Sequence, residues 1–159
     1  MKAVVQRARN ASVTVEGMVT GKISRGLLVY LGVAREDSEK DAEWMADKIA
    51  NLRIFEDAQG KMNLSIKDIL AEDTLSQAGE GEGPIGVLAV SQFTLLADAS
   101  KGRRPYYGGA AEQGKAKALY DYFMEKIRDQ GLVCEAGVFQ AHMDVSYTND
   151  GPVTILLDT

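Results

Sequence analysis

The sequence has 159 residues, of which 45% are hydrophobic and 26% are charged, a composition typical of a soluble globular protein. One cysteine and one histidine exclude an internal disulfide and a zinc site made of Cys and His ligands, so we expect neither a metal nor another cofactor. The net charge of -5 argues against non-specific binding to long nucleic acids. A local basic patch for one nucleic-acid end is compatible with it.

Hydropathy along the chain predicts the compartment and the number of domains. The apolar run near Met1 is too short for a signal-peptide core, and no stretch approaches the roughly 20 apolar residues of a membrane helix. We therefore expect a cytoplasmic protein with no membrane partner. No internal repeat or composition break divides the chain, so residues 1–159 are predicted to form a single domain.

The first half of the chain predicts a β meander, a buried strand and a helix. Alternating apolar residues indicate the meander, and the continuous apolar run after it is typical of a strand buried on both faces. A serine N-cap followed by acidic residues marks the start of the helix. The predicted elements are strands over 2–8, 11–16, 18–23 and 26–33, a helix from Ser38 to about Leu52, a short segment over 62–66 and an acidic glycine-rich loop over 77–86.

The second half predicts one more amphipathic helix between strands. The helix has apolar residues at helical spacing and ends at a glycine. The predicted elements are strands over 87–96, 132–136, 143–147 and 153–157, a basic loop over 98–109, a helix from about Ala116 to Gly131 and a turn over 149–151. This order predicts an α+β fold, in which two main helices pack on a mixed, mostly antiparallel, barrel-like sheet.

The common catalytic motifs do not occur in the sequence. It has no Walker loop, no dinucleotide-binding glycine motif, no HExxH and no GxSxG. His142 is the one possible base for a catalytic triad, but its place at the start of a strand favours a partly exposed residue without such a role. Cys134 lies in an apolar strand, and we expect a buried, unreactive thiol.

Two short segments are not fully explained by strand formation. Polar residues interrupt an apolar strand over 91–94, and buried polar groups need partners or a ligand. Alternating solvent-facing residues would explain them equally well. The second segment, 149–154, contains a Gly-Pro bond, which is typical of a hairpin turn but also compatible with a cis peptide.

Two further features are candidates for contact with a nucleotide. The stretch from Lys101 to Tyr107 combines three cations with two aromatic rings, which suits phosphates and a stacked base, although a solvated loop has the same composition. Phe139 is a lone aromatic residue near His142, and it is compatible with a core position or with a purine stacked on it.

Together these segments resemble the D-aminoacyl-tRNA deacylases of the bacterial and eukaryotic type. Residues 91–95 match the SQxTL motif of that family, and residues 149–154 match its NxGPxT motif. The resemblance spans the whole chain, with further matches over 6–7, 11–15, 26–29, 53–55, 60–64 and 118–120. The chain departs from the family pattern at residues 79–84, which form a glycine-rich insertion, and at His142, where an acidic residue is common.

The resemblance implies a homodimeric editing hydrolase. It would cleave the ester that joins a D-amino acid to the 3′-terminal adenosine of tRNA, and glycyl-tRNA would be a second substrate. Gly151 and Pro152 would form a cis peptide that enters the pocket of the partner subunit and rejects L-aminoacyl-tRNA, and Arg7 would brace that peptide.

The same resemblance assigns the remaining site residues. Ser91, Gln92 and Phe93 would line the pocket, with the backbone N–H of Phe93 as oxyanion donor. Thr94 would belong to the site, although no base neighbours it in sequence, and the 2′-hydroxyl of the tRNA would activate water. The two other substrate-binding residues would be Phe139, near the adenine, and Met143.

Two other functions compete with this one. A non-catalytic module would hold the tRNA end without cleaving it, and its binding would not depend on the acyl group. A general esterase with Thr94 as nucleophile would hydrolyse simple activated esters and would not require tRNA. Neither alternative requires the Gly151-Pro152 motif.

Overall fold

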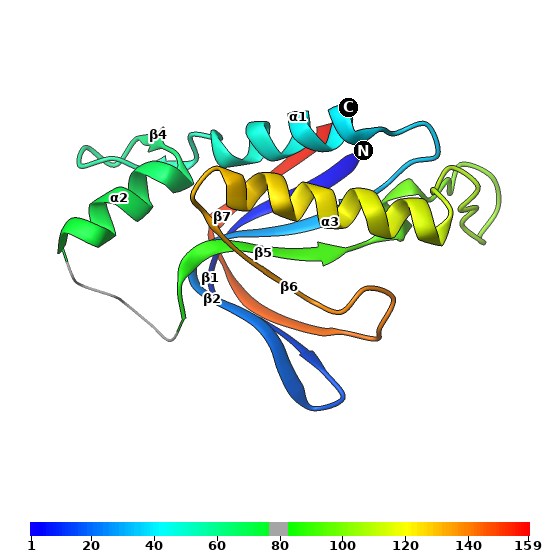
Figure 1. Ribbon diagram of the computed structural model, residues 1–159, viewed down its shortest axis with the longest axis horizontal. Helices are drawn as coiled ribbons and strands as arrows, with labels where there is room; N and C mark the ends of the chain where they lie inside the picture. The colour runs from blue at the N-terminus through cyan, green and yellow to red at the C-terminus, as the bar shows by residue number, and fades with distance from the viewer. Residues whose placement is uncertain (77–82) are drawn as a thin grey trace.

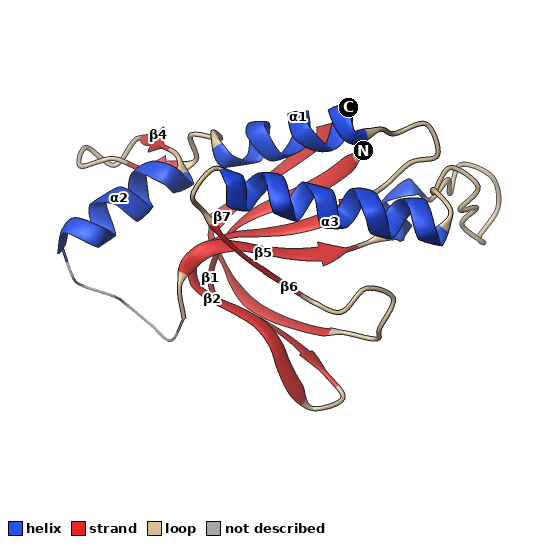
Figure 2. Cartoon of the chain, in the orientation of Figure 1, coloured by secondary structure: helices blue, strands red, loops and turns tan. Residues whose placement is uncertain are grey.

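The computed structural model describes residues 1–76 and 83–159. Its elements in chain order are β1 (Lys2–Val15), β2 (Met18–Gly32), α1 (Glu39–Ala50), β3 (Phe55–Glu56), β4 (Met62–Leu64), α2 (Ile66–Ser76), β5 (Ile85–Ser91), the 3-10 helix η1 (Phe93–Leu96), α3 (Gln113–Asp129), β6 (Val133–Ala136) and β7 (Asp144–Asp158). Helices α1 and α3 lie side by side over a twisted sheet, and α2 and β4 lie at one end of it (Figure 1). The predicted α+β class is confirmed (Figure 2).

The main sheet has the strand order β6-β5-β2-β1-β7. Strand β1 pairs antiparallel with β2 and β7, whereas β5 pairs parallel with β2 and β6. The parallel pairs arise because α1 and α2 lie between β2 and β5, and α3 lies between β5 and β6, so each chain return passes over the sheet. The described part of the sheet is open, with β6 and β7 at its two edges, and the predicted barrel-like curvature does not close it.

Three pairs of predicted strands are single long strands in the structure: 2–8 and 11–16 form β1, 18–23 and 26–33 form β2, and 143–147 and 153–157 form β7. The break expected after Ala8 is an irregularity within β1, where Asn10 has a φ of 51° and the register with β7 shifts. The predicted turn over 149–151 is likewise part of β7. Strand β1 pairs with β2 and β7 on both sides of these irregularities. The long neighbouring strands therefore keep β1 and β7 continuous through them.

The predicted strand over 87–96 is wrong in its second half. Strand β5 ends at Ser91, and residues 93–96 form the 3-10 helix η1. The N–H of Gln92 still donates to Leu31 O at 2.8 Å, but the N–H of Leu95 donates back to Gln92 O at 3.2 Å, which turns the chain away from the sheet. The SQxTL motif therefore lies at the point where the strand becomes a turn.

Helices α1 and α2 begin where short polar side chains bind the backbone. Asp41 accepts hydrogen bonds from the backbone N–H and the hydroxyl of Ser38, at 2.8 and 2.7 Å, as the predicted helix start requires. The same arrangement joins Ser65 to Asp68 at the start of α2, a helix that was not expected from the sequence. Residues 77–82 of the predicted glycine-rich loop lie outside the described residues.

Apolar side chains pack on both faces of the sheet. The larger cluster fills the space between the sheet and helices α1 and α3, and includes Leu27, Val29, Met45, Ile49, Phe123 and Ile127. A smaller cluster on the other face includes Ile23, Leu28, Leu88 and Val90. The second half of β2, residues 26–32, and strand β5 are almost fully buried and have the continuous apolar sequences expected of central strands. No helix in the described ranges is long and apolar enough to cross a bilayer.

Candidate active site

A cavity of about 680 Å³ opens at the carboxyl ends of the parallel strands β2, β5 and β6. Each of these strands leads into a segment that lines it: Val33 follows β2, Gln92 follows β5 and residues 139–143 follow β6. Ligand sites commonly lie at this edge of a parallel sheet, because several loops converge there and can vary without disturbing the core. The topology therefore brings together segments that are far apart in the sequence.

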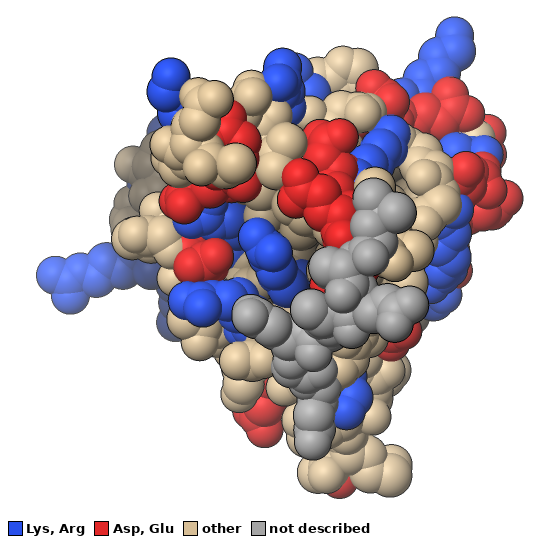
Figure 3. Space-filling view, turned by 90° about the vertical axis from the view of Figure 1, so that its left-hand side faces the viewer, with Lys and Arg blue, Asp and Glu red and all other residues tan. Residues whose placement is uncertain are grey.

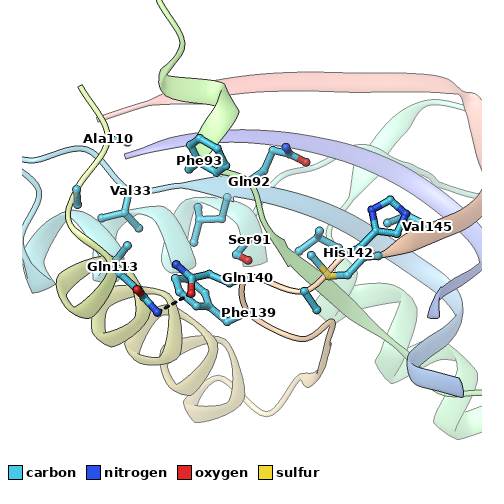
Figure 4. A pocket seen from close by; sticks show the side chains of 16 residues that line it. Val33, Ser91, Gln92, Phe93, Ala110, Gln113, Phe139, Gln140, His142 and Val145 are labelled. Carbon is cyan, nitrogen blue, oxygen red and sulfur yellow. Dashed lines mark hydrogen bonds between the residues drawn. The ribbon is translucent and has the colours of Figure 1, made fainter. Parts of the chain in front are cut away.

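Three of the residues predicted to be catalytic line this cavity. Ser91 and Gln92 are half-buried, whereas 58% of Phe93 is exposed at the rim. In the close view, Phe93 and Phe139 lie on opposite sides of the cavity, with Ser91 between them (Figure 4). Phe93 is the first residue of η1, so its backbone N–H has no partner within that turn and is available to a ligand.

Thr94 is placed differently from its neighbours. Its side chain is exposed, and it is not among the described residues that line the cavity. Gln92 Nε2 donates a hydrogen bond to Thr94 Oγ1 at 2.5 Å, and this bond joins the side chains of the two residues. An amide nitrogen is a donor and not a base, so this contact does not activate the hydroxyl as a nucleophile.

Phe139 forms one wall of the cavity and is fixed from behind. Its ring centroid lies 6.0 Å from that of Tyr120, and Lys117 Nζ lies 6.0 Å from the Phe139 centroid. Tyr120 is itself buried and donates to Ala89 O at 2.9 Å. Phe139 thus packs against the core and also presents its ring to the cavity. A core position and a role in stacking on a purine are therefore compatible for this residue.

Residues at the start of α3 and just before it complete the rim, and no sequence pattern predicted them. Gln113 Nε2 donates to Gln140 Oε1 at 2.5 Å across the mouth of the cavity (Figure 4). Ala111 reaches the lining because its N–H donates to Val33 O at 2.9 Å. Alanine and glutamine residues near the start of a helix form no motif by which they could be recognised as part of a site.

Met143 and His142 also line the cavity, at the end of the loop that follows β6. The His142 side chain is 95% exposed, and its Nε2 lies 3.9 Å from Asp144 Oδ1, which agrees with the expected exposed histidine. Cys134 is buried, and desolvation raises the pKa of its thiol to about 12, as an unreactive cysteine requires.

The Gly151-Pro152 peptide is cis, and it lies outside the cavity of its own chain. On β1, Gln6 pairs with Thr154 and Ala8 with Asn149, so four residues of β7 lie opposite the single residue between them. This bulge projects from the sheet edge, and both Gly151 and Pro152 are exposed.

The buried side chain of Arg7 binds the backbone of this bulge. Arg7 is 5% exposed, its Nη1 donates to Ile54 O at 2.8 Å, and its Nε donates to Asp150 O at 3.1 Å. Strand β2 lies between β1 and β5 and relates their positions. Arg7 of β1 pairs with Leu27, whereas Ser91 of β5 pairs with Leu31, four residues further along β2. That offset corresponds to about 13 Å along the strands, so Arg7 supports the cis peptide and not the cavity of its own chain.

Metal ligands are not grouped in the described residues. Within 1–76 and 83–159, no three His, Cys, Asp or Glu side chains are placed so that they could hold an ion.

Known proteins resemble the chain over its whole length. A family model described as D-Tyr-tRNA(Tyr) deacylase matches residues 4–158. The D-aminoacyl-tRNA deacylase of Koribacter versatilis is 55% identical and that of Thermotoga petrophila 53% identical, each over 159 residues that cover 100% of this chain and 97% of the relative.

Two solved structures have the same fold. One is named c-Myc DNA Unwinding Element Binding Protein, with a TM-score of 0.84 and 41% identity, and it covers 100% of this chain and 99% of its own. The other is described as a probable eukaryotic D-amino acid tRNA deacylase, with a TM-score of 0.76 over 99% of this chain and 98% of its own. At 16% identity, the second shows the fold alone. From the full-length family match and these identities, the chain belongs to the D-Tyr-tRNA(Tyr) deacylase family.

Proposed function

We propose that the chain is an editing hydrolase that cleaves the ester of D-aminoacyl-tRNA and releases the free D-amino acid and tRNA. One observation carries the proposal: the first three residues of the SQxTL motif line a cavity, whereas the NxGPxT motif presents an exposed cis peptide outside that cavity. Two copies of the chain supply both halves of one site. Family membership and the placement of the two motifs support the same reaction.

The reaction needs little from the side chains because an aminoacyl ester is already activated. Water attacks the ester carbonyl carbon, negative charge develops on the carbonyl oxygen, and the bond to the ribose 3′-oxygen then breaks as that oxygen takes up the proton lost by the water. The backbone N–H of Phe93 donates to the developing oxyanion. The vicinal 2′-hydroxyl of the tRNA activates the water, and the cavity contributes mainly by positioning. A substrate ending in 2′-deoxyadenosine is therefore expected to lose most of its turnover.

Chirality is selected by exclusion. The exposed Gly151-Pro152 peptide of one protomer enters the cavity of its partner, where its carbonyl oxygens accept hydrogen bonds from the substrate α-ammonium. In that orientation the peptide occupies the space of an L side chain. Glycine has no side chain to exclude, so glycyl-tRNA is the expected second substrate.

The edge strand β7 supports a homodimer of this kind. Strand β7 lies at the edge of the sheet, and Leu156 on it is 76% exposed. An unpaired strand edge with an exposed apolar side chain is usually covered, and in a two-fold dimer each copy covers the other. The terminal adenosine then lies against Phe139 and Met143 in the cavity.

The decisive experiment measures ester loss from D-tyrosyl-tRNA and L-tyrosyl-tRNA side by side, with purified protein and a chelator. Rapid loss of the D ester alone is the expected result. Loss of both esters would instead indicate a general esterase, and binding without loss of either would indicate a module that holds the tRNA end.

A mixing experiment tests the shared site. Ser91→Phe obstructs the cavity and Pro152→Ala alters the inserted peptide, so each variant alone is expected to be inactive. Hybrid dimers of the two contain one intact site, so an equal mixture is expected to recover about a quarter of the wild-type rate. A mixture that stays inactive, although hybrid dimers are detected, would show that both motifs act within one chain.

A further inference from the structure

Residues 98–107, which follow η1, form a loop whose two ends are joined by backbone hydrogen bonds. Asp98 and Tyr106 exchange two backbone hydrogen bonds, each 2.8 Å long, which close a loop over residues 99–105. The Asp98 carboxylate accepts a hydrogen bond from the N–H of Ser100 at 2.8 Å. We call residues 98–107 the basic loop. It lies beyond the carboxyl end of β5, near the first turn of α3 (Figure 1).

Three cations at the tip of this loop form no ion pair with a carboxylate in the described part of the chain. Lys101, Arg103 and Arg104 are all exposed, and none of them takes part in the ion pairs among residues 1–76 and 83–159. The one carboxylate within the loop, that of Asp98, is bound at the base. In a chain with net charge -5, this is a local concentration of positive charge.

At the opposite end of the molecule, the cations lie close to carboxylates. Lys and Arg side chains there lie beside Asp and Glu on the face that carries α2 and β4 (Figure 3). Other arginines are paired as well: Arg7 Nη2 lies 3.7 Å from Glu56 Oε1, and Arg9 Nη2 lies 3.3 Å from Asp150 Oδ1. Neighbouring carboxylates cancel much of the field of such cations, so they attract a polyanion less strongly than the basic loop does.

Aromatic rings connect the basic loop to the cavity. Phe93 at the cavity rim contacts Tyr107 edge-on, with ring centroids 5.1 Å apart. Tyr106, the next residue toward the tip, is 68% exposed, and Tyr107 is 39% exposed. Exposed aromatic rings beside unpaired cations are the combination that binds single-stranded nucleic acid, because bases stack on the rings while phosphates meet the cations.

We propose that the basic loop is a subsite for the single-stranded nucleotides that precede the terminal adenosine of the tRNA. This inference rests on the proposed function, which places the adenosine in the cavity. Lys101, Arg103 and Arg104 contact the phosphates, and Tyr106 stacks on a base. The subsite recognises the RNA strand and takes no part in the hydrolysis itself.

The salt dependence of deacylation tests the phosphate contacts. The triple variant Lys101→Gln, Arg103→Gln, Arg104→Gln is compared with a control, Lys48→Gln, Lys61→Gln, Lys67→Gln, which removes the same charge at the other end of the molecule. We expect kcat/KM for D-tyrosyl-tRNA to fall about 10- to 100-fold in the loop variant at low salt. The slope of log kcat/KM against log salt should also decrease by about 2, or about 0.7 per lost phosphate contact. Equal slopes for the loop variant, the control and the wild type would overturn the proposal.

A truncated substrate separates this subsite from the reaction. D-tyrosyl-adenosine carries the ester but lacks the preceding nucleotides, so the loop variant is expected to hydrolyse it as fast as the wild type does. A loop variant that is equally slow on both substrates would overturn the subsite and indicate a damaged cavity. If the wild type hydrolyses neither substrate, the proposed function fails, which is a different outcome.

The contribution of stacking is tested with Tyr106→Ala and Tyr106→Phe. The alanine variant is expected to lose about tenfold in kcat/KM on the tRNA substrate, and the phenylalanine variant, which keeps the ring, is expected to retain it. Neither change should affect hydrolysis of D-tyrosyl-adenosine. Equal losses in the two variants would exclude a stacking role and favour a contact of the hydroxyl.

Discussion

Arg7 and Asp150 are joined by two contacts: Nε of Arg7 lies 3.1 Å from the carbonyl oxygen of Asp150 and 3.4 Å from its Oδ2. The arginine is buried, whereas Gly151 and Pro152, which follow Asp150 in the bulge of β7, are exposed. A rigid, always charged guanidinium thus holds the backbone next to the cis peptide from the inside. A neutral or shorter side chain would leave the carbonyl oxygens of Ile54 and Asp150 without their donor.

Arg7→Met is therefore expected to destabilise the fold by about 2 kcal/mol, because two carbonyl groups lose a charged donor. Arg9→Met is the matched control, since Arg9 is exposed and pairs with the carboxylate of Asp150, and it should cost less than about 1 kcal/mol. Urea denaturation of both variants measures the difference. Equal stabilities would show that Arg7 is not required to hold the bulge.

Gly151→Ala is expected to destabilise the bulge by about 1–3 kcal/mol and to lower deacylation. Gly151 has a φ of +124°, and an added Cβ would lie 2.8 Å from Val153 Cγ2 and 3.0 Å from Arg7 Nη2. Gly114→Ala, on the first turn of α3 with open space around it, is a control that should stabilise the protein by about 0.5–1 kcal/mol. Thermal denaturation measures both changes: Tm should fall in Gly151→Ala and rise in Gly114→Ala.

Thr94→Ala is expected to keep its rate within about tenfold of the wild type, because the threonine does not line the cavity and has no base beside it. Single-turnover hydrolysis of D-tyrosyl-tRNA measures the effect. A loss of several orders of magnitude in a folded variant would identify a protein nucleophile and would favour the esterase alternative.

Cys134 is expected to resist alkylation in the folded protein. Its pKa of about 12 keeps the thiol protonated at pH 8, and its side chain is buried. Iodoacetamide at pH 8 should label the denatured chain rapidly and the native chain hardly at all, as mass spectrometry would reveal. Rapid labelling of the native chain would mean that β6 opens readily.

Asp41→Ala is expected to cost about 1 kcal/mol at pH 7, because the carboxylate caps the first turn of α1. Hydrogen bonds from Ser38 lower the pKa of Asp41, so its stabilisation is present above the ordinary aspartate pKa and is lost as the pH falls through the lowered value. The difference between wild type and variant should therefore shrink at pH 2–3. A difference that is independent of pH would exclude the charged cap.

The sequence located most elements because their patterns are local. The helix start at Ser38 is predicted by side chains within four residues, and the buried strands β2 and β5 are predicted by unbroken apolar runs. The breaks near Asn10 and Gly151 were misplaced because a long partner strand maintains the ladder through residues that end strands elsewhere. The strand predicted through Thr94 was wrong because a backbone turn at Gln92 is not encoded in hydropathy.

The sequence by itself determined the α+β class, the two motifs and the expected inert character of Cys134, since each depends on neighbouring residues. Only the tertiary structure decided which residues share the cavity. Gln113 and Gln140 meet there because the segments that follow the parallel strands converge at one edge of the sheet, and this depends on pairing between distant segments. It also placed Gly151 outside the cavity of its own chain, because the strand pairing of β7 with β1 carries the bulge to the opposite part of the sheet.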